Sequence, residues 1–468
     1  MSAKIFDVLV VGSGLSSMIF CEEYLKKKKL INVISPDFKK TKQENNLAIN
    51  FNSLPPQYKK SLDKILDYFK FNNIFFDKDN CNILGSLEFG GLSNYWGLQL
   101  DKNIKDDLKG LSFKTKHNII NCFNELLKEK KLLGNFEKKK NNFILDRFYE
   151  NYLKLNKKKL HNFFLEKPIL AIQGKNSQNT SISTIEKKIT KLEPKSIFEN
   201  LKNKIKIHNY YVESFSKKKN LIYISCVNNS IKKIFITKKL ILASGTIVST
   251  KLIIDYLNFK KEVSLKHHPR LISMYFARNK IKSNLDFTPG LLQVKSKTNS
   301  KTVSVSDVRP SNTKIITSGL KIFPFLKPFK FILMFLKNYI LLSNTLLGSS
   351  ESNLFIKKQK NFFLIYSKKK NLLKKLKYKQ RDVYKFLRNQ KIIFPFFKNF
   401  FPGVGGDYHY FGTIEIGKKG ILSVDEQCRL KNNNEIYVID GCVFNFKKNM
   451  YPLGLVMANA KRVAKILN

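Results

Sequence analysis

The chain has 468 residues, of which 43% are hydrophobic, so it can bury a large core, and its composition excludes an intrinsically disordered protein. Its 86 lysines and arginines against 35 aspartates and glutamates give a formal net charge of +51, which suggests nucleic acid or an anionic membrane as a partner. The lysines, however, are spread from Lys4 to Lys465, and asparagine, isoleucine, phenylalanine and tyrosine are also abundant. All of these residues have A/T-rich codons. We therefore favour nucleotide bias as the origin of the charge, with a selected polyanion or membrane preference as the alternative.

The six cysteines show no paired spacing and predict reduced thiols, not a disulfide framework or a metal site. A first strand at Ile5 leaves no room for a signal peptide. We expect a cytoplasmic protein, with peripheral contact at the inner membrane as the alternative.

A strand at Ile5–Val11, a glycine turn, a helix from Leu15 and a second strand at Ile31–Ile34 open the chain. Gly12, Gly14 and Ser17 occupy the three small positions of the turn that precedes dinucleotide-binding helices, where a pyrophosphate meets the helix N-terminus. The acidic residue that usually follows the second strand and binds the ribose is replaced by Ser35. Asp37 lies two residues further on, and either of these two side chains is a candidate for the ribose.

Residues 81–97 contain four glycines around the only tryptophan, Trp96. This composition predicts a loop whose backbone passes close to a flat or crowded group. A tight turn anchored by an aromatic side chain is the alternative. Residues 114–131 have the apolar spacing of an amphipathic helix.

From Ile205 the pattern changes to strands, at Ile205–His208, 221–226 and 231–237. They lead to a buried strand at 239–242, a small-residue turn that contains Gly245, and a helix at 247–257.

Residues 321–347 form the most apolar region, which is interrupted by lysines and prolines. No uninterrupted run reaches the ~20 residues that span a bilayer, so we exclude a transmembrane helix. We expect a core helix or strand, with an interfacial membrane helix at 331–342 as the alternative.

Residues 405–417 place His409 in a glycine-flanked segment. A strand at 434–440 then ends in an Asp440-Gly441 turn, and Tyr451-Pro452 opens a last helix that runs to Leu467.

This last order of motifs, His-x-x-Gly-Thr, then Asp-Gly-x-Val-Phe, then a proline and a C-terminal helix, resembles the glucose-methanol-choline (GMC) oxidoreductases. The Gly-Ser-Gly turn, the Gly-Gly-Leu-Ser loop at 90–93 and the strand at 242–245 occur in the matching order. The motifs leave residues 100–195 and 270–400 unmatched. The resemblance implies an α/β fold with a two-dinucleotide-binding-domain (Rossmann-like) FAD domain formed by residues 1–100, 195–268 and 405–468. It also implies an inserted α+β substrate domain formed by residues 101–194 and 269–404.

The cofactor implied by the resemblance is FAD. The glycine loop is similar to that of a subgroup with a covalent histidyl-flavin link, but Tyr95 occupies the matching position, so we expect noncovalent FAD. A helix that begins after Pro452 would direct its N-terminus at the negative charge of the reduced flavin. The positions that match cofactor-binding positions of the family are Gly12, Gly14, Ser17, Ser35, Asp37, Gly91, Ser93, Asn94, Gly245, Asp440, Gly441 and Pro452.

In the family, the histidine that matches His409 takes the hydroxyl proton of an alcohol while hydride passes to the flavin. An imidazole with a pKa near ~6.5 suits this role. A second histidine or asparagine normally precedes the proline, but here the position is Tyr451, with Asn449 two residues earlier. Because a phenol is a poor base at neutral pH, His409 would carry proton abstraction alone. The alternative for His409 is a structural role within its loop.

The resemblance thus predicts an FAD-dependent dehydrogenase or oxidase that acts on the CH–OH group of a sugar or other alcohol. The glycine-tryptophan loop resembles that of family members associated with bacterial cell-surface polysaccharide synthesis. This favours a nucleotide- or lipid-linked sugar as substrate and leaves the electron acceptor open. We expect no specific nucleic-acid partner. The alternative is a degenerate flavoprotein without turnover that binds polyanions or a membrane surface.

Overall fold

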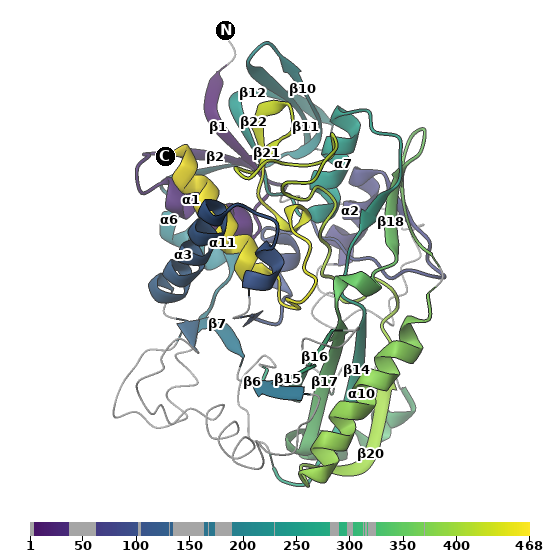
Figure 1. The fold of residues 1–468 in the computed structure, drawn as a ribbon. Coiled ribbons are helices and arrows are strands. Elements are labelled where there is room, and N and C mark those ends of the chain that lie inside the picture. The colour runs from purple at the N-terminus through teal and green to yellow at the C-terminus, as the bar shows by residue number, and fades with distance from the viewer. Residues whose placement is uncertain are drawn as a thin grey trace.

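The computed structural model describes residues 4–36, 62–101, 104–130, 132–133, 163–166, 168–173, 190–228, 230–280, 290–296, 303–311, 313, 316, 324–368 and 370–468. Within these residues the chain has mixed α/β content, with several sheets and helices (Figure 1). Among them, no helix combines the length and the apolar character that crossing a membrane requires.

The largest sheet has a parallel centre in the order β9 (Ile205–His208), β2 (Ile31–Ile34), β1 (Ile5–Val11), β12 (Ile231–Leu242) and β22 (Asn433–Val438). The chain moves from β1 to β2 on one side and from β12 to β22 on the other, so the strand order reverses between β1 and β12. The antiparallel strand β11 (Leu221–Asn228) pairs with the first half of β12, and β10 (Tyr211–Lys218) pairs with β11. The short strand β21 (Arg429–Leu430) pairs with β22.

The predicted strands at 231–237 and 239–242 are one strand, because β12 continues through the boundary between them. Its first half is largely exposed, whereas Leu240–Leu242 is buried between β1 and β22. The other predicted strands of this sheet are confirmed.

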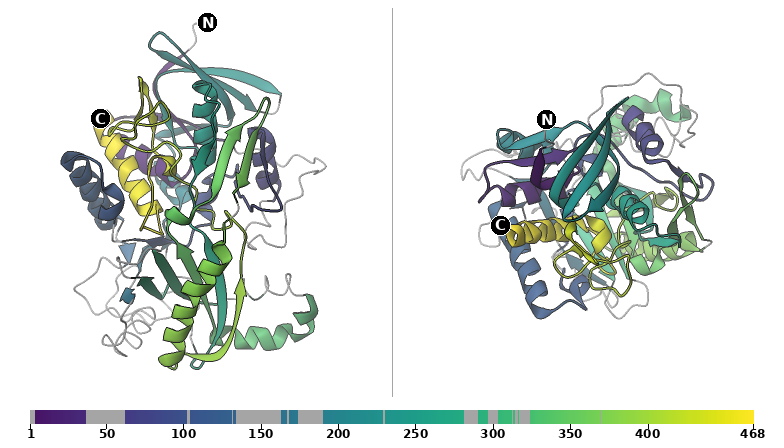
Figure 2. Two further views of the ribbon diagram at one scale, coloured as in Figure 1. Left: turned by 45° about the vertical axis from the view of Figure 1, so that its right-hand side comes forward. Right: turned by 90° about the horizontal axis from the view of Figure 1, so that it is seen from above.

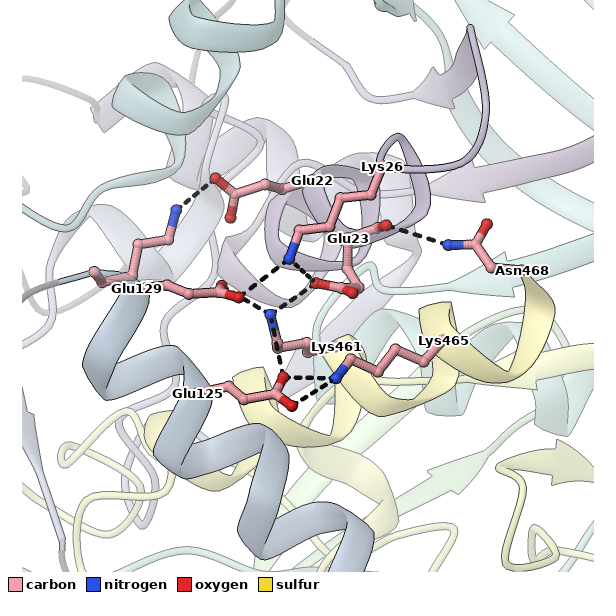
Figure 3. Close-up of polar contacts among 9 residues, drawn as sticks. Glu22, Glu23, Lys26, Glu125, Glu129, Lys461, Lys465 and Asn468 are labelled. Carbon is pink, nitrogen blue, oxygen red and sulfur yellow. Dashed lines mark hydrogen bonds and ion pairs between the residues drawn. The ribbon is translucent and has the colours of Figure 1, made fainter.

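Three predicted helices pack on one another: α11 (Leu453–Leu467) contacts both α1 (Leu15–Tyr24) and α3 (Phe113–Glu129). The buried ammonium of Lys461 on α11 lies 2.7 Å from a Glu23 carboxylate oxygen and 2.8 Å from one of Glu129 (Figure 3). Burial opposes the charge of Lys461, but the two carboxylates outweigh burial and raise its pKa. This ion cluster ties the last helix to α1 and α3. Two further helices are α6 (Pro194–Leu201), which contacts α1, and α7 (Thr246–Tyr256), which contacts β10.

A second, six-stranded antiparallel sheet lies toward the opposite end of the molecule, beside α10 (Leu372–Asn389) (Figure 1). Its strands are, in order, β20 (Ile393–Phe400), β14 (Arg270–Ala277), β17 (Ile340–Leu347), β16 (Ser304–Pro310), β15 (Leu292–Ser296) and β6 (Phe163–Glu166). One smaller sheet joins β13 (Val263–Leu265), β18 (Leu354–Lys358), β19 (Phe363–Ser367) and β3 (Ile74–Phe76), next to α2 (Leu62–Asn72). Another joins β4 (Gln99–Leu100), β7 (Ile169–Gln173), β5 (Leu132–Leu133) and β8 (Thr190–Lys191).

The apolar region at 321–347 divides into two parts. Strand β17 lies in the middle of the six-stranded sheet and is largely buried, as expected for a core strand. Helix α9 (Lys330–Leu336) has no buried residue, so the prediction of a core element is wrong for this part. The spacing of apolar residues could not indicate an exposed face, because the helix is apolar on nearly all sides.

The six cysteines are all buried and unpaired, which confirms that they form no disulfide framework. Burial raises the pKa of the Cys21 and Cys226 thiols to about 12. These thiols are therefore protonated core side chains.

Candidate functional site

The turns that follow the parallel strands meet at one edge of the large sheet. The amide of Gly12, after β1, donates a 2.8 Å hydrogen bond to the carbonyl of Ile34 at the end of β2. Gly12 has φ +106°, and a Cβ there would lie 2.3 Å from the carbonyl oxygen of Ala243, which follows β12. Only glycine permits this approach of the two turns. In open α/β sheets, a ligand binds outside the carboxyl ends of the strands where the strand order reverses.

The glycine loop at 90–94 is fastened to the start of α1. The Ser93 hydroxyl accepts a 3.1 Å hydrogen bond from the amide of Leu15. The Ser13 hydroxyl accepts one of 2.9 Å from the amide of Gly90 and one of 2.7 Å from the hydroxyl of Ser35. A Cβ at Gly14 would lie 3.3 Å from Ser93 Oγ. Two other segments of the chain, at Ser35 and at 90–93, therefore border the N-terminus of α1.

Two further sequence-predicted residues belong to this corner, and a third falls outside it. Ser35 is buried and uses its hydroxyl on Ser13, and Ser17 is fully buried within α1. Asp37 lies outside the described residues.

The glycine loop itself is a tight 3-10 turn, Gly91–Asn94, which follows a left-handed Gly90 (φ +91°). The Asn94 amide donates a 2.7 Å hydrogen bond to the carbonyl of Phe89, and the hydroxyl of Tyr95 donates to Glu88. The indole N–H of Trp96 is buried and has no hydrogen-bond partner among the described residues.

The turn after β22 is joined to the start of α7. The carboxylate of Asp440 accepts hydrogen bonds from the Cys442 amide, at 3.1 Å, and from the Ser249 hydroxyl. Burial raises the pKa of this carboxyl. Gly441 packs closely on Thr246. Gly245 precedes α7 with φ +84°, and no atom lies within 4 Å of the place that a Cβ would take.

His409 belongs to a cluster of three histidines around a buried aspartate. Lys266 and Phe411 exchange backbone hydrogen bonds of 3.0 and 2.9 Å, which brings His267 and His268 next to Asp407 and His409. Asp407 accepts hydrogen bonds from His267 Nδ1, at 2.7 Å, and from the amides of His268 and His409, at 3.2 and 2.9 Å.

The two facing imidazoles of this cluster have defined tautomers. His268 Nε2 lies 3.0 Å from the carbonyl oxygen of Phe446, which only accepts, so this nitrogen carries the proton. His268 Nδ1 is therefore an acceptor and lies 3.5 Å from His409 Nδ1. The proton of neutral His409 is then on Nδ1, and its Nε2 lone pair is left to accept a proton.

Burial is the main cause that lowers the pKa of His409 to about 4, with Arg270 and Arg309 acting in the same direction and the charges of Asp407 and Asp307 opposing them. Burial, followed by the charge of His409, lowers the pKa of His268 to about 3. The ordinary value near 6.5 expected for His409 is thus corrected, because the imidazole is desolvated and faces two arginines. His409 is neutral at pH 7 and able to accept a proton.

The second predicted catalytic position is filled by buried side chains. Tyr451 packs with Val305 and Leu346, and burial together with the charge of Asp307 raises its pKa well above the ordinary value. The side-chain oxygen of Asn449 accepts a 2.9 Å hydrogen bond from the backbone amide of Tyr451. The side-chain nitrogen of Asn449 is buried and has no partner among the described residues. Pro452 then precedes α11.

Asp307 and Arg309 on β16 form an ion pair. Their charges influence the pKa of both His409 and Tyr451, so the two predicted catalytic residues share one electrostatic environment. Sequence reasoning missed His267, His268, Asp407, Asp307 and Arg309. Two signals in the sequence could have identified them. One is the pair of adjacent histidines in His267-His268-Pro269, and the other is the aspartate two residues before the predicted catalytic histidine, in Asp407-x-His409.

A cleft of about 960 Å³ lies beside the histidine cluster. Its lining includes Asn353, whose side-chain oxygen lies 3.4 Å from His267 Nε2. Asn82, Lys368 and Lys370 also line it, and each has a partner within the protein: Asn82 donates to the carbonyl of Pro402, Lys368 to Glu262 and Lys370 to the carbonyl of Ser350.

No family model matches the chain, and no curated protein matches it either.

Proposed function

We propose that this chain is a cytoplasmic FAD-dependent oxidoreductase of the GMC type, with a Rossmann-like cofactor domain and an inserted substrate domain. It would oxidise the CH–OH group of a sugar or other alcohol. Bound FAD would supply the hydride acceptor. The observation that carries the proposal is one hydrogen bond of 2.6 Å, from the hydroxyl of Thr246 at the start of α7 to the backbone carbonyl of Tyr410. It holds the residue next to His409 against the turn that contains Gly245.

The strand topology supports the cofactor domain. All strands of the eight-stranded sheet come from segments 1–100, 195–268 and 405–468, and all strands of the six-stranded sheet come from 101–194 and 269–404. The reversal of strand order between β1 and β12 coincides with the closest approach of their two turns, at Gly12 and Ala243.

The residues at these turns suit a flavin dinucleotide. They would contact it mainly with backbone groups and with side-chain N–H groups that have no partner in the protein, and less with charged side chains. Gly12 and Gly14 would border the pyrophosphate, and the open space at Gly245 leaves room for a ligand. The buried N–H groups of Trp96 and Asn449 await an acceptor. The side chains of Ser35, Ser93 and Asp440 are already partnered within the protein. Their contacts with a cofactor would come mainly from the backbone of their turns.

His409 would take the substrate hydroxyl proton on Nε2. Its Nδ1–H would then donate to His268 Nδ1, so that the developing positive charge is shared with a second imidazole. Asp407 would hold the backbone of both histidines in place. Tyr451, with its raised pKa, would remain a neutral hydroxyl and no base.

The test is the flavin itself. The purified protein should be yellow, and acid precipitation should release the colour into the supernatant because the cofactor is noncovalent. Anaerobic bleaching by a sugar or another alcohol would demonstrate turnover. A yellow protein that no alcohol bleaches would support the degenerate flavoprotein, and a colourless protein that does not take up added FAD would contradict both.

A further inference from the structure

Helix α9 exposes an apolar face. Phe331 is 86% exposed, Phe335 72% and Ile332 52%, and Phe329 just before the helix is 54% exposed. The other side of the helix is anchored, because Leu333 and Met334 pack against β14 and β17 around Ile340. A surface helix usually turns polar residues to water. A contiguous apolar surface of this kind marks an interaction site.

A second set of exposed aromatics lies at the same end of the six-stranded sheet. Phe396 is 71% exposed and Phe394 43% exposed on the edge strand β20. At the end of β14, Phe276 pairs with the first residue of β17, which α9 precedes, and Ala277 pairs with Ile393, the first residue of β20. The two sets therefore flank one strand end. This end lies away from β1 and β10, and the helix formed by residues 330–336 projects there in the left view of Figure 2. We call it the distal aromatic surface, which consists of Phe329, Phe331, Ile332, Phe335, Phe394 and Phe396.

The charges next to these aromatics in the sequence are all positive. Residues 321–340 and 391–400 contain six lysines and no carboxylate, whereas the whole chain has 86 basic residues against 35 acidic ones. Lys327, Lys330, Lys391 and Lys398 are exposed beside the aromatics. Lysines that flank exposed phenylalanines suit the boundary of an anionic bilayer, where rings enter the headgroup layer and ammonium groups meet phosphates.

Strand β20 also disfavours a second copy of the chain as the occupant. Pro395 removes a backbone donor from the edge strand, and the pairing with β14 shifts register at this point. Both features obstruct the addition of another strand. Two such basic surfaces would also repel each other.

We propose that the distal aromatic surface docks the protein on an anionic lipid bilayer. The proposal is independent of the flavin, so its test is independent of activity.

The experiment is cosedimentation of the full-length protein with vesicles of phosphatidylcholine alone or with about one third phosphatidylglycerol. The unchanged protein should pellet with the anionic vesicles only. Phe331→Ser combined with Phe335→Ser should weaken this binding at least about tenfold, because two rings no longer enter the interface. Lys327→Gln combined with Lys330→Gln should weaken it by about fivefold per lysine.

The matched control is Phe113→Ser, which removes an equally exposed phenylalanine (84%) at the start of α3 and should change nothing. All replaced side chains are exposed, so thermal unfolding should be unaltered in every variant. Equal binding by the Phe331/Phe335 variant and the unchanged protein would overturn the proposal in favour of diffuse charge attraction. A dimer that dissociates in the Phe331/Phe335 variant, with no vesicle binding, would assign the surface to a second copy.

Discussion

At the end of the molecule built on the eight-stranded sheet, polar and charged side chains are buried, whereas at the end built on β14 and β20, aromatic side chains lie on the surface. His268, Asp407 and Asp440 are all at most 3% exposed, while Phe331 is 86% exposed. Both arrangements depart from the usual distribution of side chains. At the first end, the hydrogen bonds of the buried groups account for the departure. At the second, the rings are exposed among the described residues, apart from Phe394, over which the Arg278 guanidinium lies at 5.2 Å, and we propose an external partner for them.

Substitutions at the two ends should therefore have different effects. Substitutions at the buried end should affect stability and chemistry, because most of the polar groups there have hydrogen-bond partners that would be left unsatisfied. Substitutions at the distal aromatic surface should affect binding alone.

The largest effect is expected for Gly12→Ala. A Cβ at 2.3 Å from a backbone oxygen, on a residue with φ +106°, forces β1 and β12 apart and should lower the free energy of unfolding by more than about 3 kcal/mol. Gly14→Ala is the control, since its Cβ would meet Ser93 Oγ at 3.3 Å and the Gly90 carbonyl oxygen at 3.8 Å, and it should cost less than about 1 kcal/mol. Urea unfolding of both variants measures the difference. Equal stability would mean that the two turns do not approach as described.

Gly14→Asp completes this pair of substitutions. The protein should fold, but an added carboxylate at the N-terminus of α1 should prevent a pyrophosphate from binding. Full flavin content in the folded variant would place the cofactor elsewhere.

Lys461→Met should lower the free energy of unfolding by about 3 kcal/mol, because it leaves Glu23 and Glu129 with less compensation in a partly buried cluster. Lys465→Met removes a neighbouring ammonium that pairs with Glu125 at the surface, and it should cost at most about 1 kcal/mol. Chemical unfolding of the two variants under the same conditions compares them. If Lys465→Met were the more damaging change, the buried cluster would not be what fastens α11.

His409→Ala should slow flavin reduction by at least about a hundredfold with FAD still bound, since it removes the proposed general base. Tyr451→Phe should slow it by about tenfold or less, as expected for the loss of one neutral hydrogen bond. Stopped-flow single-turnover bleaching measures both. Because the pKa of His409 is lowered to about 4, the rate should stay level from pH 9 down to about pH 5 and fall only below it. A rate that falls through pH 6.5 would mean that the histidine is solvated, and a larger defect in Tyr451→Phe would transfer the catalytic role to the tyrosine.

Much of the large sheet could be predicted from the sequence, because strands buried on both faces are continuous apolar runs. The glycine turn after Ile5–Val11 and the helix from Leu15 were equally clear. The histidine cluster could not be predicted, because His267 and His409 are brought together only by backbone pairing between segments about 140 residues apart. The exposure of α9 could not be predicted either, because an apolar helix can have the same composition in a core and on a surface.

The smallest effect concerns acid and the buried imidazoles. The pKa of His268 is lowered from 6.5 to about 3 by burial, so between these values the unfolded chain binds a proton that the native protein does not. Stability must therefore fall as the pH drops below about 6.5, by about 2 kcal/mol at pH 5 from this residue. Asp107 acts in the opposite direction, because burial raises its pKa to about 6 and its native form takes up a proton in this range. The variant His268→Gln separates the two, since its amide can still donate to Phe446 but does not titrate. Unfolding at pH 7 and pH 5 should show that the unchanged protein loses about 2 kcal/mol more than the variant. Equal losses would mean that His268 is protonated in the native protein at pH 5, and the proposed acceptor for His409 Nδ1–H would then be absent at that pH.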